Sequence, residues 1–162
     1  MPKMSESAVV SKIKGSYSAS VLDVVEYRGE TTVTVKKEDI VAICSFLKEQ
    51  GFNFLTDQTA VDNLGQAPRF MVVYQMQNLT SKAKLRVKCP VEEGDASVDT
   101  VSGVWSTANW MEREIWDLFG ITFKGHPDLR RILLDDEWEG HPLRKDYPVQ
   151  GPDREPYQGR IR

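Results

Sequence analysis

The chain has few residues of the kinds that hold cofactors or build disulfide frameworks. Its 162 residues include only two cysteines, Cys44 and Cys89, which stand far apart among apolar or strand-forming neighbours. Two cysteines are too few for a disulfide framework, a four-cysteine zinc site or a cysteine-ligated iron–sulfur cluster. We therefore expect two buried free thiols, which fit a reducing compartment.

Long apolar segments and a strong net charge are also missing. No uninterrupted apolar run is longer than that from Phe70 to Tyr74, whereas a membrane-spanning helix needs about 20 residues. The first residues show no apolar segment of a secretory signal, so we expect membrane contact only through other chains. A net charge of −3 gives no overall field that would attract nucleic acid or an anionic membrane.

Motifs for nucleotide chemistry and nucleophilic catalysis are absent from the sequence as well. It contains no phosphate-binding glycine loop and no serine or cysteine nucleophile in a recognisable setting. With 40% apolar residues the chain can bury an ordinary core, and its length fits one domain with appendages.

Residues 1–103 are predicted to form an α+β domain, in which a small, mostly antiparallel sheet packs against helices. The expected elements, in chain order, are a helix at 8–15, strands at 21–27 and 31–36, a helix at 38–50, strands at 52–60, 69–76 and 84–89, and a short helix within 97–105. The first two strands flank a short glycine turn and indicate a hairpin. One sheet face should contact a helix, and the other should be solvated or docked.

The strand at 84–89 shows the clearest alternation of apolar and basic residues. Lys84, Arg86 and Lys88 share one side of this strand. The basic row could bind phosphate, but no aromatic residues interleave with it, so a solvated sheet face is the favoured interpretation.

The segment from Asn109 to Pro148 carries three of the four tryptophans and both histidines. Large apolar residues alternate there with charges, and buried charges cost folding free energy unless they are paired. We expect a helix that begins at Asn109, with Glu112 completing a capping box, and ends at Gly120. The density of charge predicts that this segment contacts a binding partner.

The charges of this helix are expected to fall into two groups. Arg113 and Asp117 should form an i,i+4 pair on the face opposite the apolar residues. Glu112 and Glu114 lie at the apolar borders, where they could serve as general acid and base. Because no nucleophile accompanies them, ion pairs are favoured instead. The candidate partners are Arg130, Arg131 and Arg144.

Two glycine-histidine-proline tripeptides follow, at 125–127 and 140–142. His126, His141 and Asp128 could together bind a metal. Hydrogen bonds from the histidines that fix turns are the favoured interpretation.

From residue 140 to residue 162 the sequence loses periodicity. Pro142, Pro148, Pro152 and Pro156 exclude a helix and discourage a sheet. From His141 onward five basic residues oppose three acidic ones, a net charge of +2, whereas the rest of the chain carries −5. We therefore predict an extended tail that binds a partner.

These motifs resemble a known family. The stretches 112–121, 125–133 and 138–148 closely resemble the signature of the C subunit of proton-pumping NADH–quinone oxidoreductase, respiratory complex I. The resemblance implies a part for residues 104–139 as signature helix and bridge, and for residues 140–162 as partner-binding tail. The signature and interface residues that it implies are Glu112, Arg113, Glu114, Trp116, Asp117, Phe119, Gly120, His126, Pro127, Asp128, Arg130, Arg131, Gly140, His141, Pro142, Leu143, Arg144, Lys145, Asp146 and Tyr147.

The family also implies a role. Its members carry no cofactor and pack against the D subunit in the hydrophilic arm, beside the quinone-reducing region. Flavin and iron–sulfur clusters are expected in the partner subunits, and the complex is expected at the cytoplasmic face of the bacterial inner membrane.

Three other interpretations stay open at this point. The same module could belong to a related membrane-bound hydrogenase, a photosynthetic ferredoxin-using complex or a coenzyme-F420-type dehydrogenase. A stand-alone hydrolase would require Glu112, Glu114 and His126 to converge in one pocket. A nucleic-acid-binding module that used the basic strand and tail would show a strongly salt-dependent affinity.

Overall fold

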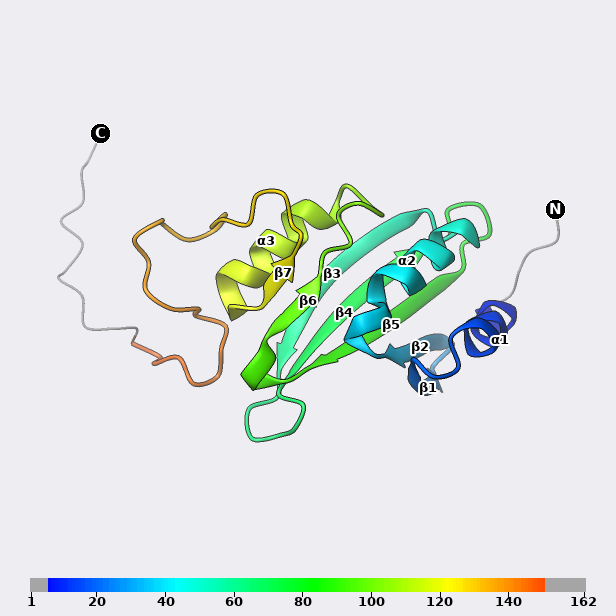
Figure 1. Cartoon of the computed structure of the whole chain (residues 1–162), viewed down its shortest axis with the longest axis horizontal. Coiled ribbons are helices and arrows are strands. Elements are labelled where there is room, and N and C mark those ends of the chain that lie inside the picture. Colours follow the sequence, from blue (N-terminus) through cyan, green and yellow to red (C-terminus); the bar gives the residue numbers. More distant parts are fainter. Residues whose placement is uncertain (1–5, 151–162) are drawn as a thin grey trace.

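The computed structural model describes residues 6–150, which form an α+β fold (Figure 1). Its elements are α1 (Glu6–Ser16), β1 (Val21–Tyr27), β2 (Glu30–Val35), η1 (Lys37–Asp39), α2 (Ile40–Glu49), β3 (Phe54–Asp62), β4 (Phe70–Gln77), β5 (Lys84–Val91), η2 (Glu93–Asp95), β6 (Ser97–Asp99), α3 (Ala108–Phe119) and β7 (Thr122–Lys124). Five strands form one sheet in the order β1-β2-β5-β4-β3, and β6 pairs with β7 in a second sheet. The predicted fold class is confirmed.

The predicted hairpin is also confirmed, and its strands are joined by a two-residue turn. β1 and β2 pair antiparallel with Tyr27 opposite Glu30. The two residues between them, Arg28 and Gly29, have φ values of +53° and +76°. Positive φ at both central positions is the geometry of a type I′ turn, whose twist matches that of paired strands.

One pairing inside the sheet, that of β2 with β5, is parallel, which the sequence pattern did not indicate. β2 runs parallel to β5, with Thr32 opposite Arg86, whereas the other three pairings are antiparallel. The sheet is therefore mixed but mostly antiparallel, as predicted. The parallel pair joins the amino-terminal hairpin to the three-stranded meander β3–β4–β5.

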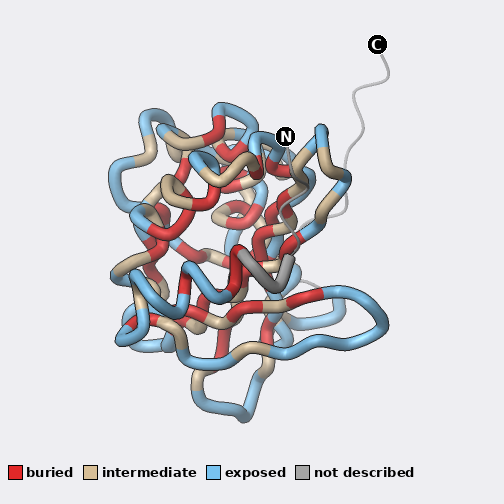
Figure 2. The backbone as a smooth tube through the Cα atoms, turned by 90° about the vertical axis from the view of Figure 1, so that its right-hand side faces the viewer, coloured by how far each residue is buried: buried red, intermediate tan, exposed pale blue. Residues whose placement is uncertain are grey.

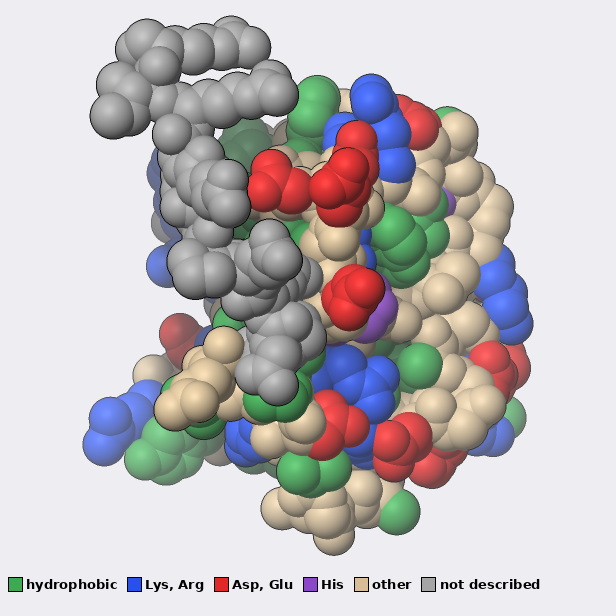
Figure 3. All heavy atoms as spheres, turned by 90° about the vertical axis from the view of Figure 1, so that its left-hand side faces the viewer, with side chains coloured by type: hydrophobic (Ala, Val, Ile, Leu, Met, Phe, Trp, Pro, Cys, Tyr) green, Lys and Arg blue, Asp and Glu red, His purple; other side chains and the backbone are tan. Residues whose placement is uncertain are grey.

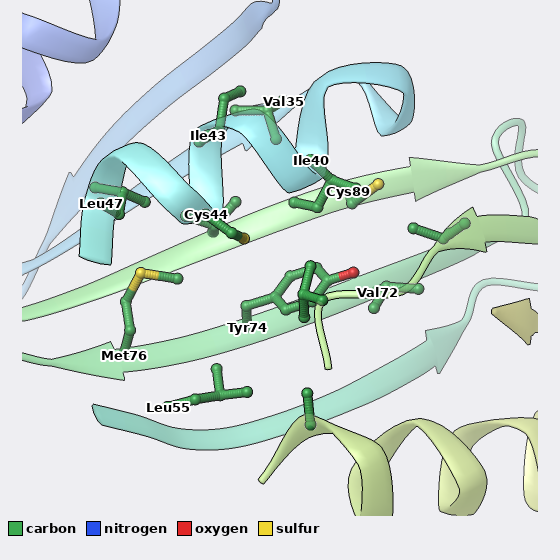
Figure 4. Close-up of a cluster of buried hydrophobic side chains, with 14 of the residues drawn as sticks. Val35, Ile40, Ile43, Cys44, Leu47, Leu55, Val72, Tyr74, Met76 and Cys89 are labelled. Atoms are coloured by element: carbon green, nitrogen blue, oxygen red, sulfur yellow. The ribbon is translucent and has the colours of Figure 1, made fainter. Parts of the chain in front are cut away.

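The main core is formed by buried residues of the sheet and the helices, and Figure 2 shows these buried positions gathered in the interior of the molecule. Ile40, Ile43, Cys44 and Leu47 of α2 are fully buried, and Figure 4 shows them beside the core residues of β4 and β5. Both cysteines are free thiols inside this core, as expected, and burial raises the pKa of Cys89 to about 12. The thiols therefore stay protonated at neutral pH.

The predicted short helix within 97–105 is wrong. Ser97–Asp99 forms β6, which pairs in parallel with β7, and turns follow at 102–104. The reason is tertiary: Val98 is 2% exposed and lies opposite the buried Phe123 in the pairing. Local periodicity over so short a segment carries no signal of that distant partner.

The basic row of β5 lies on the less buried face of the sheet, as predicted. Leu85, Val87 and Cys89 are buried on the helix-facing side, whereas Lys84, Arg86 and Lys88 are exposed or half-buried. Arg86 donates a 2.7 Å hydrogen bond to Glu30. Within residues 6–150, no helix is long and apolar enough to cross a membrane.

Candidate partner interface

Helix α3 is the element on which the signature residues are organised. It packs against β3 and buries Ile115 and Phe119, as its apolar periodicity predicts. It ends at Gly120, whose φ of +76° places it in the left-handed region and whose N–H donates to the carbonyl of Trp116. Unexpectedly, three of its charged residues, Glu112, Arg113 and Asp117, are buried as well.

Arg113 and Asp117 do not pair with each other on an exposed face, so that prediction is wrong. Both instead hold the backbone of the bridge, which we define as residues 125–139. The Arg113 guanidinium donates to the carbonyls of Arg130 (3.1 Å) and Arg131 (2.8 Å). The bridge follows β7 and has no helix or strand of its own, so its backbone groups need side-chain partners.

Asp117 satisfies the other side of the same loop. One carboxylate oxygen accepts the N–H groups of Ile132, Leu133 and Leu134 at 2.9–3.1 Å. The other accepts from the Arg131 guanidinium at 2.6 Å. Burial pushes the pKa of Asp117 upward, but these hydrogen bonds outweigh it and leave that pKa below its ordinary value. The carboxylate is therefore charged at neutral pH and anchors the loop.

Arg131 links the bridge to the segment that follows it. Besides Asp117, its guanidinium donates to the carbonyls of Trp138 (2.6 Å) and Gly140 (3.2 Å). It also lies 5.7 Å from the ring centre of Trp116. This planar five-donor group thus ties α3 to the end of the bridge and to the first residue that follows it.

His141 fixes the start of the strap, which we define as the described residues 140–150. Its Nδ1 lies 2.8 Å from the Asp117 carbonyl, and its ring meets Trp116 edge-on. A side-chain carbon on Gly120 would come within 2.6 Å of the His141 ring. Gly120 is therefore required both by its positive φ and by the close approach of this histidine.

His126 fixes the start of the bridge in the same manner, so the predicted turn-fixing role of both histidines is confirmed. Its Nε2 lies 3.0 Å from the carbonyl of Asn109, and its Nδ1 accepts the N–H of Asp128 at 3.1 Å. Because a carbonyl only accepts, these bonds define the neutral tautomer with hydrogen on Nε2. Pro127 and Asp128 are exposed beside it.

Glu112 is fully buried, but neither its predicted capping role nor its predicted arginine partner is correct. Its carboxylate accepts the Thr100 hydroxyl and the N–H of Val101 (2.8 Å), and His126 Nε2 lies 4.0 Å away. No side chain caps α3, which begins after Thr107 rather than at Asn109. Burial raises the pKa of Glu112. The carboxylate ties α3 to the turn after β6.

The residues proposed for hydrolysis or metal binding do not come together. Glu112 lies 4.0 Å from His126, but Glu114 is exposed on the same helix, so the three side chains do not converge in one pocket. His126 and His141 contact different parts of α3, Asn109 and Asp117. Within the described part of the chain, no three His, Cys, Asp or Glu side chains gather into a potential metal site.

A second buried ion pair, which the sequence did not single out, lies at the end of the sheet. Arg69 precedes β4 and grips Asp62 of β3 through two bonds of 2.8 and 2.9 Å. Asp62 in turn accepts the N–H of Lys145, and Arg69 also bonds Asp146. The only sequence signal was an arginine and an aspartate flanking one loop.

The strap therefore lies against its own chain as far as Tyr147. The N–H of Leu143 donates to Leu118 O at 3.0 Å, and the Tyr147 hydroxyl donates to the carbonyl of Glu139 at 3.1 Å. A side-chain carbon on Gly140, whose φ is +81°, would come within 2.7 Å of the Tyr147 ring. Pro142 and Pro148 lie in this irregular stretch, whereas Pro152, Pro156 and the rest of 151–162 lie outside the described residues.

The outward side chains of the bridge and strap are apolar and acidic, with the basic Arg130 and Lys145 among them. Leu133 and Leu143 are 60% and 51% exposed, and Trp110 of α3 is 61% exposed. The bridge adds the exposed carboxylates Asp135, Asp136, Glu137 and Glu139. Figure 3 views this end of the molecule, where acidic, apolar and basic side chains lie side by side.

Comparison with known proteins assigns the family. A family model described as "Respiratory-chain NADH dehydrogenase, 30 Kd subunit" matches residues 33–153. The C subunit of NADH-quinone oxidoreductase from Geotalea uraniireducens is 60% identical over 163 residues, covering 99% of each chain. Its counterpart from Geobacter metallireducens is 63% identical over 154 residues, covering 94% of this chain and 95% of the relative. The chain therefore belongs to the 30 kDa subunit family of respiratory-chain NADH dehydrogenases, which includes these bacterial C subunits.

Solved structures agree with this assignment. A trypsin-resistant fragment (1-134) of Nqo5 has a TM-score of 0.70 at 32% identity, covering 78% of this chain and 100% of the fragment. A chain of the membrane-bound sulfane sulfur reductase, an archaeal respiratory membrane complex, has a TM-score of 0.75 at 25% identity, covering 88% of this chain and 85% of that chain.

Proposed function

We propose that this chain is a cofactor-free structural component of NADH–quinone oxidoreductase that binds the D subunit in the hydrophilic arm. The observation that carries the proposal is the construction of the bridge and strap. Their backbone is held by buried groups of α3 and the sheet, while Leu133, Leu143 and several carboxylates face outward. A surface ordered before binding loses less conformational entropy when a partner docks.

The buried charges of the site support a positional role over a catalytic one. Glu112 and Asp117 direct their carboxylates at backbone N–H groups of their own chain. Arg113 and Arg131 direct their guanidinium groups at backbone carbonyls. We infer that the electron carriers, flavin and iron–sulfur clusters, belong to partner subunits and that this chain helps to position the D subunit beside the quinone-reducing region.

The location follows from the same proposal. The chain would attach to the cytoplasmic face of the bacterial inner membrane through its partner subunits. Similarity to a chain of an archaeal respiratory membrane complex supports assembly beside membrane subunits.

Thiol cross-linking within the native complex tests the contact with the D subunit. Leu143→Cys places a thiol on the strap, and Leu22→Cys places one on β1; both leucines are 51% exposed. Cys44 and Cys89 are buried, so they give little background. We expect a bismaleimide reagent to join Leu143→Cys, and not Leu22→Cys, to the D subunit. Cross-linking to that partner through Leu22→Cys alone would show that the other end of the molecule carries the contact.

A measurement on the isolated chain tests the absence of cofactors. The purified protein should be colourless and should neither oxidise NADH nor reduce quinone. Visible absorbance from a stoichiometric flavin or cluster that persists through gel filtration would contradict the proposal.

The alternative complexes make a different prediction. The same module in a hydrogenase or in a ferredoxin- or F420-dependent enzyme would co-purify without an NADH-oxidising subunit. Identity of 60% to an NADH-quinone oxidoreductase chain, against 25% to the sulfane sulfur reductase chain, favours the NADH enzyme. Affinity purification from the native host, followed by identification of the co-purified subunits, distinguishes the two.

A further inference from the structure

Arg69 gathers carboxylates from three segments that are distant in sequence. Its side chain is 4% exposed, and its guanidinium contacts Asp62 at the end of β3, Glu93 in η2 and Asp146 in the strap. The two Asp146 oxygens lie 2.9 and 3.0 Å from it. Asp146 is 77 residues away along the chain, so this contact joins the strap to the end of the sheet where β3 leads into β4.

A second arginine closes the cluster from outside. Arg144 contacts Asp146 at 3.1 and 3.2 Å and Glu93 at 3.5 Å. The guanidinium groups of Arg69 and Arg144 lie 4.9 and 5.3 Å from the ring centre of Phe70. Three carboxylates thus face two guanidinium groups, so every charge of the cluster has an opposite partner and the cluster carries one net negative charge.

Outside this cluster, the strap is bonded to α3 only near its start, through His141 and the N–H of Leu143. It contains no helix or strand, and Lys145 contributes its backbone N–H to Asp62 at 2.8 Å. Asp62 therefore accepts hydrogen bonds both from the Arg69 guanidinium and from the backbone N–H of Lys145. Without the Arg69 and Asp62 contacts, residues 144–147 would keep the 3.5 Å contact of Arg144 with Glu93, the bond from the Tyr147 hydroxyl to Glu139 O and the bond from the N–H of Tyr147 to Arg144 O.

We propose that Arg69 and Asp62 form an ionic latch that holds residues 144–146 on the sheet before any partner binds. The latch fixes the point from which the chain continues beyond Tyr147. A role of the latch in assembly rests on the proposed function, because pre-ordering of the strap lowers the entropy cost of binding only for a partner that contacts the strap.

The geometry of the latch requires an arginine at position 69. A planar guanidinium can bind Asp62 with two parallel bonds and still bind Asp146, whereas an ammonium is a point donor. Arg69→Lys should therefore keep the charge but release the strap. Asp146→Asn removes the charge from the strap side and leaves the Arg69–Asp62 pair intact.

Trypsin provides the test in the isolated full-length chain, because it cleaves after Arg144 and Lys145, which both lie in the latch. Cleavage after Arg144 is measured by mass spectrometry and divided by its rate in the urea-unfolded chain of the same variant. This ratio cancels the effect of a changed residue near the scissile bond. Because cleavage of a locally opened segment follows its open population, both variants should raise the ratio about tenfold or more.

A matched control uses another aspartate of the carboxy-terminal segment. Asp128 pairs with Arg130 at 2.8 Å, but both side chains are more than half exposed. Asp128→Asn should leave cleavage after Arg144 unchanged. Cleavage after Lys48, in α2, reports on opening of the whole body and should not change in any variant.

The outcomes separate the latch from the proposed function. A raised ratio after Arg144 in Arg69→Lys and Asp146→Asn, with Lys48 protected, supports the latch. An unchanged ratio in both variants, or a parallel rise at Lys48, overturns it as a local device. The cross-link from Leu143→Cys to the D subunit is measured separately on the otherwise unaltered chain. Absence of this cross-link would contradict the proposed function without affecting the evidence for the latch.

Discussion

Helices α2 and α3 both pack on the sheet and both are followed by a glycine with positive φ, yet they bury different chemistry. α2 buries aliphatic side chains and a thiol, and Gly51 follows it with a φ of +97°. α3 buries Glu112, Arg113 and Asp117 beside its apolar residues. Two helices that pack on one sheet therefore differ in what they bury: α2 buries only apolar side chains and a thiol, whereas α3 also buries charged side chains.

The difference reflects what each helix must hold. α2 lies on strands whose backbone groups already pair with one another, so non-directional apolar burial suffices. α3 must also hold the bridge, whose N–H and C=O groups lack a ladder. Buried charges supply directional bonds to such groups, at the risk of a large penalty if one partner is lost.

Asp117→Ala should have the largest effect on stability of the substitutions considered. It removes the acceptor of three backbone N–H groups and leaves Arg131 without its buried partner. We expect a loss of about 3–5 kcal/mol, the range for a broken buried ion pair. Urea unfolding gives the free energy, and hydrogen exchange should show amides 132–134 losing protection first. Retained protection there would mean that the bridge does not depend on Asp117.

Leu47→Ala is the corresponding change on α2. The residue is fully buried, and truncation of a core leucine costs about 2–5 kcal/mol. Here hydrogen exchange should accelerate throughout the sheet and not at one loop, because apolar burial is shared by the whole core. A loss of protection confined to α2 would contradict this account.

Glu112→Gln should change how the free energy of unfolding depends on pH. Because burial raises the pKa of Glu112, the folded state binds its proton more tightly than the unfolded state. Wild-type stability should therefore fall as pH rises from the ordinary glutamate pKa through the raised one. Glutamine can still accept from Val101 and donate to Thr100, so the variant should lose this slope and be more stable than the wild type at neutral pH. If urea titrations from pH 4 upward gave the same pH dependence of unfolding free energy for the wild type and the variant, this prediction would be refuted.

Glu114→Gln should have the smallest effect of the series. Its side chain is exposed on the same helix, and surface substitutions usually stay within about 0.5 kcal/mol. A larger loss in the same urea assay would reveal a contact that exposure alone does not indicate.

The sequence predicted the elements whose signal is local. The hairpin, α2, the meander strands and the end of α3 at Gly120 follow from β-branched runs, helical periodicity and glycine positions. The two histidines were also interpreted correctly, because a following proline makes a turn the favoured setting. The motifs of residues 112–148 were specific enough to indicate the family.

The errors share a physical cause. Arg113 and Asp117 look like an exposed i,i+4 pair until the bridge folds over them, and Glu112 looks like a capping residue until Thr100 approaches it. Arg69 and Asp62 gain their meaning only from Asp146, far along the chain. Side chains that bind irregular backbone leave no periodic trace, so neither spacing nor propensity could reveal these contacts. The proposed division into three parts and the interface role of the tail stay predictions.

The parallel pairing of β2 with β5 has a consequence for the order of folding. Thr32 and Arg86 are 54 residues apart, whereas β3, β4 and β5 follow one another through short loops. Closing the long segment is entropically unfavourable until the intervening chain is ordered. We therefore expect the meander to form the folding nucleus and the β1–β2 hairpin to join it late. In stopped-flow experiments Val72→Ala in β4 should slow folding, whereas Val33→Ala in β2 should mainly accelerate unfolding; the reverse pattern would place the hairpin in the nucleus.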